Sequence, residues 1–379
     1  MKTPIRDIAT LFLKLGTIAF GGPAAHIAMM EDEVVRRRRW LSREEFLDFL
    51  GATNLIPGPN STELAIHIGH ARGGWRGLIV AGACFILPAS CIVSAIAWAY
   101  VRFGTLPEVG AILYGVKPVV IAVVFQALWG LGRAALKTRG LIALGIIAVV
   151  ASVVGVNELA IIFGAGAIMV ALRIAAGGKR DATTNLGALA VGSVFAPLGA
   201  PTVVVPFGLW PLFAIFLKIG SVLFGSGYVL LAFLRADFVE RLHWLTERQL
   251  LDAVAVGQVT PGPVFTTATF IGYLLGGPWG AVIATLGIFL PAFVFVALSG
   301  VLLPRIKHSP VVRAALDGVN VASLALMAVV TVELARAAVV DWVTLACALI
   351  SCALLVRWKI NSAWLVLAGA IVGATTRLL

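Results

Sequence analysis

Long apolar segments joined by short polar connections make up almost the whole chain. Most of them are long enough to cross the hydrocarbon core of a bilayer, which takes about 20 helical residues. Only helices satisfy their own backbone polar groups in lipid, so the pattern predicts an all-α polytopic membrane protein. To within about two residues at each end, the segments cover residues 8–30, 46–70, 77–101, 108–132, 140–156, 157–175, 187–204, 209–234, 249–274, 277–303, 311–338, 341–356 and 361–376.

Composition supports the same class. Of the 379 residues 60% are apolar and 12% are charged, against about 25% charged in soluble domains, which excludes a water-soluble enzyme and a disordered chain. Membrane lipid is therefore a predicted partner. The net charge of +11 fits basic cytoplasmic loops, and no nucleic-acid partner is predicted. The four cysteines all lie inside apolar segments, as small buried residues do.

The chain contains an internal repeat. Residues 12–59 align with residues 216–263 without a gap, and 16 of the 48 aligned pairs are identical. A polar stretch near the middle of the chain separates the two copies. We therefore expect a first repeat (1–176), a linker with a connecting transmembrane helix (177–204), and a second repeat (205–379).

The basic residues of the connections change sides between the two copies. The connection at 131–140 holds three basic residues, whereas its counterpart at 336–341 holds one. The reverse is true of 102–107, with one, and 304–313, with three. Because basic loops favour the cytoplasm, this flip predicts two inverted-topology repeats, an architecture common among secondary transporters.

Segments 8–30 and 46–70 flank a strongly basic run that includes Arg36–Arg39. Two full crossings would leave this run outside the cell, so the charge bias favours re-entrant hairpins with tips at Gly21-Gly22-Pro23 and Pro57-Gly58-Pro59. Half a segment of about eleven residues spans roughly 16 Å, half of the bilayer core. The alternative is full spans kinked by Gly and Pro. Each repeat is thus expected to have two broken or re-entrant helices followed by spanning helices.

Broken helices offer the chemistry of an anion site. The second half of each helix begins with unpaired N–H groups and the positive end of a helix dipole. The alternative is that Gly and Pro only kink the helices or allow close packing. The helix-break residues are Pro23, Pro57, Pro59, Pro261 and Pro263. The candidate substrate-binding residues at these tips are Gly21, Gly22, Gly58, Asn60, Ser61, Thr62, Gly225, Ser226, Gly262, Thr266 and Thr267.

A few charged residues interrupt the apolar segments. Lys14 and Lys218 share one repeat position and are candidates for neutralising an anion, although snorkelling to the interface would also explain them. Asp48 and Asp252 are coupling or structural acids, expected in the first turn of helices capped by Ser42 and Thr246. Glu63 is a third such acid, without an acidic counterpart, that could carry a coupling proton. Its spacing with His67 and His70 also fits three metal ligands, but we predict no metal site.

These residues form a pattern that resembles the chromate ion transporter family. The pattern runs from Phe12-Leu13-Lys14-x-Gly16 through Phe20-Gly21-Gly22, Trp40-Leu41 and Asp48 to Pro57-Gly58-Pro59, and it recurs in the second half. The resemblance implies the long-chain, two-repeat form of a family that exports chromate from the bacterial cytoplasm. It adds Gln258 to the candidate substrate-binding residues, with Asn54 at the same place in the first copy.

The resemblance implies a secondary transporter in the bacterial inner membrane that exports chromate by alternating access and confers chromate resistance. Sulfate is isosteric with chromate and remains an alternative substrate. No enzyme motif or nucleotide loop is found, so neither an enzyme nor a cofactor is predicted. A membrane-embedded enzyme or phospholipid-carrier translocase built on re-entrant hairpins, an anion channel, and assembly as a homodimer stay open.

Overall fold

The computed structural model describes residues 3–20, 22–104, 106–176, 206–224, 227–306, 309–358 and 360–378, and the regular secondary structure of this part is helical. The first repeat consists of α1 (Ile5–Ile18), α2 (Gly22–Glu31), the π-helix η1 (Asp32–Arg37), α3 (Arg43–Thr53), α4 (Asn60–Phe103), α5 (Pro107–Ala135), α6 (Arg139–Val153) and α7 (Glu158–Ala176).

The second repeat follows the same order. It consists of α9 (Leu209–Val222), η2 (Gly227–Val229), α10 (Leu230–Leu234), the π-helix η3 (Arg235–Arg241), α11 (Glu247–Val259), η4 (Val264–Thr266), α12 (Thr267–Ile306), α13 (Pro310–Ala338), α14 (Trp342–Trp358) and α15 (Ser362–Leu378). The all-helical membrane fold and the internal repeat are thereby confirmed.

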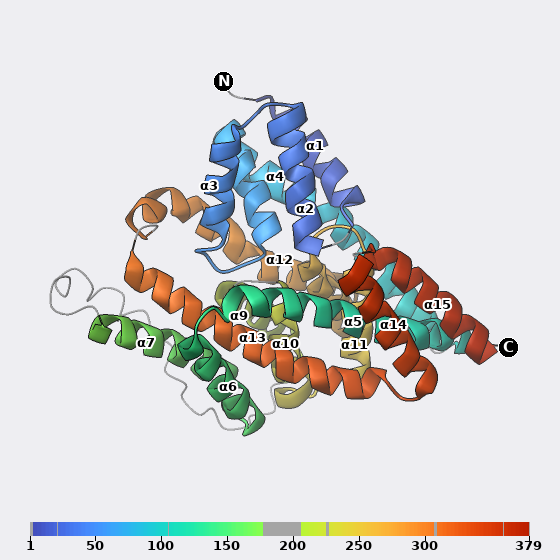
Figure 1. Cartoon of the computed structure of the whole chain (residues 1–379). Coiled ribbons are helices and arrows are strands. Elements are labelled where there is room, and N and C mark those ends of the chain that lie inside the picture. Colours follow the sequence, from blue (N-terminus) through green and yellow to red (C-terminus); the bar gives the residue numbers. More distant parts are fainter. Residues whose placement is uncertain are drawn as a thin grey trace.

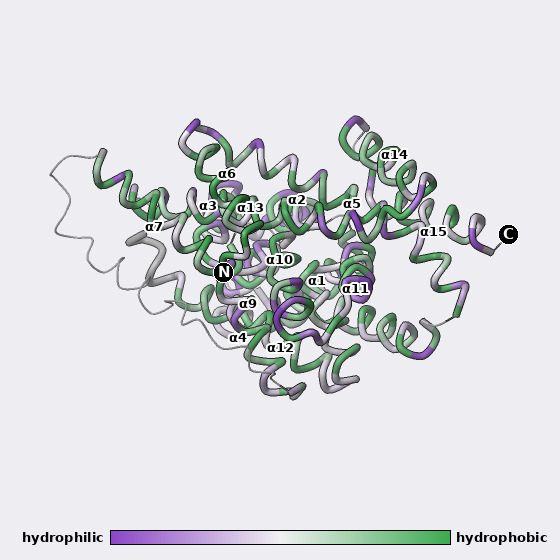
Figure 2. Tube along the Cα trace, turned by 90° about the horizontal axis from the view of Figure 1, so that it is seen from below, coloured by the Kyte–Doolittle hydropathy of each residue, from purple (hydrophilic) through white to green (hydrophobic). Residues whose placement is uncertain are grey.

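Hydropathy and helix length agree with a multi-pass membrane protein. Figure 2 shows hydrophobic residues along most of the helices, with hydrophilic residues gathered mainly near turns. By length and composition, the helices able to cross a membrane in the described part of the chain are Asn60–Phe103, Pro107–Ala135, Glu158–Ala175, Val264–Ser299 and Pro310–Ala338. The predicted segment 187–204 and the linker before it lie outside the described residues.

Two predicted connections are present as short glycine kinks. The expected break at 71–76 falls at Gly74 inside α4, where φ is 60° and ψ is −149° and two helical arms meet. The equivalent stretch of α12 bends at Gly276 and Gly277. Because glycine tolerates positive φ, one residue turns the helix where the hydropathy pattern suggested a separate loop.

Capping motifs start α3 and α11. Ser42 and Glu45 form a reciprocal capping box at the start of α3, and Thr246 and Gln249 form its counterpart at the start of α11. The predicted caps are confirmed. Asp48 and the equivalent Asp252 lie in the second helical turn, so the expected first-turn position is wrong, and neither carboxylate caps its helix.

The two repeats interlock. α6 and α7 pack against α13 of the second repeat, and α14 and α15 pack against α5 of the first. In Figure 1 these pairs lie at opposite ends of the molecule, on either side of the central α5 and α13. Contacts between α4 and α12, and between α5 and α13, join equivalent helices. At Gly115 a Cβ atom would collide with the backbone of Gly369, so only glycine allows α5 and α15 to approach this closely.

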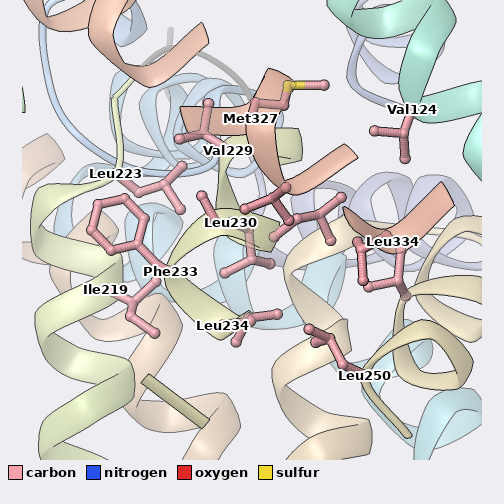
Figure 3. Close-up of a cluster of buried hydrophobic side chains, with 14 of the residues drawn as sticks. Val124, Ile219, Leu223, Val229, Leu230, Phe233, Leu234, Leu250, Met327 and Leu334 are labelled. Carbon is pink, nitrogen blue, oxygen red and sulfur yellow. The ribbon is translucent and has the colours of Figure 1, made fainter. Parts of the chain in front are cut away.

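Buried apolar side chains form two main clusters. The larger one joins α9–α13 to α5, α6 and α7, and Figure 3 shows its centre, with Leu230 and Phe233 of α10 packed between α9 and α13. The smaller one holds together α1, α2, α3 and the first part of α4, including Phe12, Phe46 and Phe85. These helices lie at the top of Figure 1 and share this buried cluster.

Candidate functional site

All four predicted helix breaks are present. They separate α1 from α2, α3 from α4, α9 from η2, and α11 from η4. Gly22, with φ of 76°, begins α2, and Pro59 and Pro263 occupy the N-cap positions of α4 and η4. Pro57 and Pro261 each precede the glycine of their break. Gly21, Gly225 and Ser226 lie outside the described residues.

Two hydrogen bonds join the breaks of one repeat to those of the other. The N–H of Gly58 donates to the carbonyl of Leu223 at the end of α9, with an N···O distance of 2.7 Å. The equivalent Gly262 donates to Ala19 at the end of α1, at 3.0 Å. Both glycines have positive φ, 137° and 87°. These N–H groups, which the sequence suggested for anion binding, therefore satisfy helix-end carbonyls across the repeat interface.

A cavity of about 410 Å³ lies where the breaks meet. Each of the four breaks contributes to its wall, and α5 supplies the remainder. Its described lining consists of Pro23, Ala24, Ile27, Pro59, Asn60, Ser61, Gln126, Ala127, Gly130, Leu131, Gly227, Pro263, Val264 and Phe265. This convergence is what the sequence predicted for the helix tips.

The cavity wall offers donors and helix ends. Asn60 and Ser61 begin α4, where the first N–H groups have no acceptor within the helix, and Val264 and Phe265 hold the equivalent positions at η4. Side-chain polarity comes from Asn60, Ser61 and Gln126. The described lining contains no Lys or Arg, so the polar groups of the wall are helix ends and neutral side chains.

Other predicted residues at the breaks do not line this cavity. The hydroxyls of Thr266 and Thr267 donate to the carbonyls of Pro263 and Val264, both at 2.8 Å, and so secure the start of α12. Thr62 is buried next to the cavity residue Ser61. Gln258 lies one turn before the α11 break, outside the cavity lining.

Lys14 and Lys218 form ion pairs with acidic residues and do not line the cavity. Lys14 Nζ lies 2.7 Å from Glu33 Oε1, and Lys218 Nζ lies 2.7 Å from Oδ1 of the equivalent Asp237. Arg37 completes the first pair, as Arg241 does the second. The hydrogen bond from Lys14 holds the pKa of Glu33 below its ordinary value. The same arrangement in both repeats ties η1 to α1 and η3 to α9, and neither lysine lines the cavity.

A buried ion pair crosses the repeats on one side only. Lys117 Nζ on α5 lies 2.9 Å from Asp252 Oδ1 on α11, and the Tyr100 hydroxyl donates to Asp252 Oδ2 at 2.8 Å. Lys117 is 9% exposed and Asp252 is 1% exposed. The repeat equivalent of Lys117 is Asn320 on α13, and the repeat equivalent of Asp252 is Asp48 on α3, which is exposed.

Glu63 lies in the first turn of α4 and is fully buried. The two histidines on the same face of α4 make aromatic contacts: the ring of His67 stacks on Phe49, and the ring of His70 contacts Trp75. Among the described residues, no group of three His, Cys, Asp or Glu side chains could hold a metal ion.

Sequence reasoning missed Gln126. It is a polar residue within an otherwise apolar stretch of α5, and that contrast was the available signal. Lys117 is a charge within an apolar segment, but Asn320, its repeat counterpart, gives no hint of its partner. Pairing with Asp252 depends on how α5 and α11 pack, which the sequence does not reveal.

Comparison with known proteins places the chain in a family. The profile of the family described as Chromate transporter matches residues 6–170 and again residues 210–374, with the same offset as the internal repeat. No solved structure matches the chain.

Relatives match along almost the full length. The chromate transport protein of Cupriavidus metallidurans is 33% identical over 372 residues, which cover 97% of this chain and 91% of the relative. That of Pseudomonas aeruginosa is 34% identical, covering 86% and 80%, and a probable chromate transport protein of Synechococcus elongatus is 31% identical, covering 94% and 91%. The chain, a multi-pass helical membrane protein with two copies of one repeat, therefore belongs to the chromate transporter family.

Proposed function

We propose that this protein exports chromate, or a related tetrahedral oxyanion such as sulfate, from the cytoplasm across the bacterial inner membrane and thereby confers chromate resistance. The observation that carries the proposal is the cavity shared by four helix breaks, in a chain of this family. Helix N-termini and small polar side chains suit an anion that needs many hydrogen-bond donors. Membership of the family supports chromate as the substrate.

Contacts at the helix ends support re-entrant hairpins. The N–H of Thr3, just before α1, donates to Arg72 O next to the α4 kink, and Arg72 Nη1 donates to Trp40 O before α3, both at 3.0 Å. The start of α1, the connection after η1 and the α4 kink thus meet at one end of the hairpins. In the second repeat, Phe207 and Trp244 meet equivalently, with ring centroids 5.3 Å apart. Together with the charge flip, this favours inverted hairpins whose tips meet at mid-membrane.

The membrane potential supplies a driving force for export. A dianion that leaves a cell with a negative interior gains about 2.3 kcal/mol per charge per 100 mV, roughly 4.6 kcal/mol for two charges. This is enough for export without nucleotide hydrolysis, as expected of a secondary transporter.

Unequal burial of equivalent helices supports alternating access. Leu47 on α3 is 52% exposed, whereas its repeat equivalent Leu251 on α11 is 1% exposed. Likewise Gly51 is exposed and its equivalent Ala255 is buried. Two copies of one unit thus adopt two arrangements, packed at α11 and open at α3. Exchanging the arrangements between the copies would close the α3 side and open the α11 side.

A second cavity on the open side adjoins the central cavity. This cavity of about 200 Å³ is lined by Asn54 just after α3, Lys137, and Asp317 and Asn320 of α13. Leu131 lines both cavities, and Asn60 Nδ2 donates to Asn54 Oδ1 at 2.9 Å between them. The basic connections on this side favour the cytoplasm, so this arrangement corresponds to a state ready to load an anion from inside.

Flux measurements test the function. Purified protein in liposomes should exchange chromate, with sulfate as competitor, at a rate that saturates with substrate and responds to an imposed potential. A folded protein that moves neither anion would refute the proposal. Flux that fails to saturate would instead indicate a channel, and flipping of a labelled phospholipid carrier would indicate a translocase.

A further inference from the structure

Glu63 is a buried acid without a partner. Its side chain is 0% exposed, and neither carboxyl oxygen has a hydrogen-bond partner among the described residues. Two neighbours on α4, Thr62 Oγ1 and His67 Nε2, are also buried and unpartnered. Buried polar groups in proteins are nearly always hydrogen-bonded, so a group of such atoms one turn behind the helix break calls for a functional explanation.

No cation in the described region neutralises this carboxyl. On the elements packed against the start of α4, the ionisable side chains are otherwise engaged or exposed. Lys14 of α1 pairs with Glu33, and Asp252 of α11 pairs with Lys117. His26 of α2 contacts Ser61 and Ala19, and Asp48 of α3 is exposed. η4 and the start of α12 carry no ionisable side chain before Tyr273. An isolated carboxylate costs far more to bury than a neutral acid, so the buried form carries a proton.

The carboxyl lies directly behind the candidate anion site. A Cβ atom on Gly58 would collide with Glu63 Oε1, which places the carboxyl against the break itself. Pro59, Asn60 and Ser61, the next residues along the chain, line the cavity. A negative charge on Glu63 would oppose an anion there and cancel the attraction of the helix end, whereas a proton restores that attraction.

Only the first repeat has this feature. Thr267 occupies the equivalent position, and its hydroxyl is satisfied by the carbonyl of Val264. Among the described residues, the equivalent position is therefore an acid in the first copy and a neutral threonine in the second.

We propose that Glu63 is a proton-binding site whose occupancy favours the oxyanion in the adjacent cavity, so that one proton and one dianion bind and move together. The inference rests on the proposed function and specifies its coupling ion. By linkage, protonation raises anion affinity and the anion raises proton affinity by the same factor. Each transport cycle then moves one net negative charge instead of two.

Anion binding at different pH tests the linkage. The dissociation constants of sulfate and of chromate would be measured on purified protein from mildly acidic to alkaline pH, for the wild type, Glu63→Gln and Glu108→Gln, a control at an exposed acid. The wild type and Glu108→Gln should lose about tenfold in affinity or more as pH rises, within the usual range of coupling between sites. Glu63→Gln should keep the high affinity for sulfate at every pH. Chromate itself titrates near neutrality, but that effect is common to all three proteins.

Each result of this experiment either supports or overturns the proton site. Unchanged pH dependence in Glu63→Gln would overturn the proposal, as would loss of binding at every pH, which would make the carboxyl a direct ligand. If Glu63→Gln fails to fold, Glu63→Thr, which copies the second repeat, takes its place. A wild type that transports with pH-independent affinity and two charges per cycle refutes the proton site alone, whereas a wild type without transport refutes the proposed function.

Discussion

Replacing Lys117 by asparagine should release α11 from α5. The variant copies the second repeat, in which Asn320 stands at this position. At the Nζ–Oδ1 distance of 2.9 Å the pair attracts by about 6 kcal/mol at an effective dielectric constant of about 20, and desolvation of both charges offsets part of this. Removing one partner of a buried pair costs about 3–5 kcal/mol.

This cost falls on one state only. With α11 packed, Asp252 would keep the Tyr100 hydroxyl but lose its counter-charge. Once α11 moves away, water can solvate the carboxylate. A shift of about 3 kcal/mol changes the ratio of the two states by about a hundredfold, since 1.4 kcal/mol is tenfold. A state with α11 open would then become well populated.

Cysteine accessibility measures the exchange. Gly51→Cys on α3 and Ala255→Cys on α11 occupy equivalent positions, the first exposed and the second 1% exposed. Each is introduced singly into a chain whose native cysteines are replaced, and labelled with a membrane-impermeant maleimide from either side. With Lys117 present, only Gly51→Cys should react quickly. With Lys117→Asn, Ala255→Cys should react at least about tenfold faster and Gly51→Cys more slowly, because the ratio of the two states has changed.

The control is Arg139→Asn, which removes an exposed basic residue that lines neither cavity. It should leave both labelling rates unchanged. Continued protection of Ala255→Cys in a folded Lys117→Asn protein would refute the reasoning that the ion pair holds α11 shut. Faster labelling at both positions would mean that the variant loosens the fold, which also contradicts an exchange between two arrangements.

Three further predictions concern backbone contacts and the cavity wall. Gly262→Ala should lower the thermal unfolding midpoint and slow transport, because φ is 87° and the added methyl meets Ala89; an unchanged midpoint would count against the cross-repeat bond. Gly115→Leu should destabilise the protein by at least about 2 kcal/mol through a backbone clash with α15, whereas Gly164→Leu, where a Cβ atom meets nothing, should have little effect on unfolding in denaturant. Gln126→Leu should weaken oxyanion binding about tenfold by removing a cavity donor, without changing the unfolding midpoint; equal affinity would exclude Gln126 from the site.

The helix breaks show how far local sequence reaches. Gly22, Gly58 and Gly262 adopt positive φ where the chain leaves helical geometry, and the prolines beside them begin the next helices. These preferences act within a few residues, so the sequence predicted the break positions correctly. The kink at Gly74 has the same cause, but hydropathy could not distinguish a one-residue kink from a loop.

The lysines show where local sequence fails. Lys14 and Lys218 were candidates for neutralising an anion because an intramembrane charge is costly, with snorkelling to the interface as the alternative. In the structure, Glu33 pairs with Lys14 and Asp237 pairs with Lys218, and each acid lies nineteen positions after its lysine. The described cavity lining offers neutral donors such as Gln126 instead, and the place of Gln126 in it becomes visible only once α5 is packed beside the breaks.

The sequence by itself determined the helical membrane class, the repeat and the four breaks. These follow from hydrophobic run length, self-similarity and the backbone preferences of Gly and Pro, none of which needs knowledge of distant contacts. Only the tertiary structure decided which breaks are hydrogen-bonded to each other, which acid each lysine meets, and that α3 is exposed while its equivalent α11 is buried. Nearly identical units can pack in two ways, because burial depends on neighbours far along the chain and not on a unit's own residues.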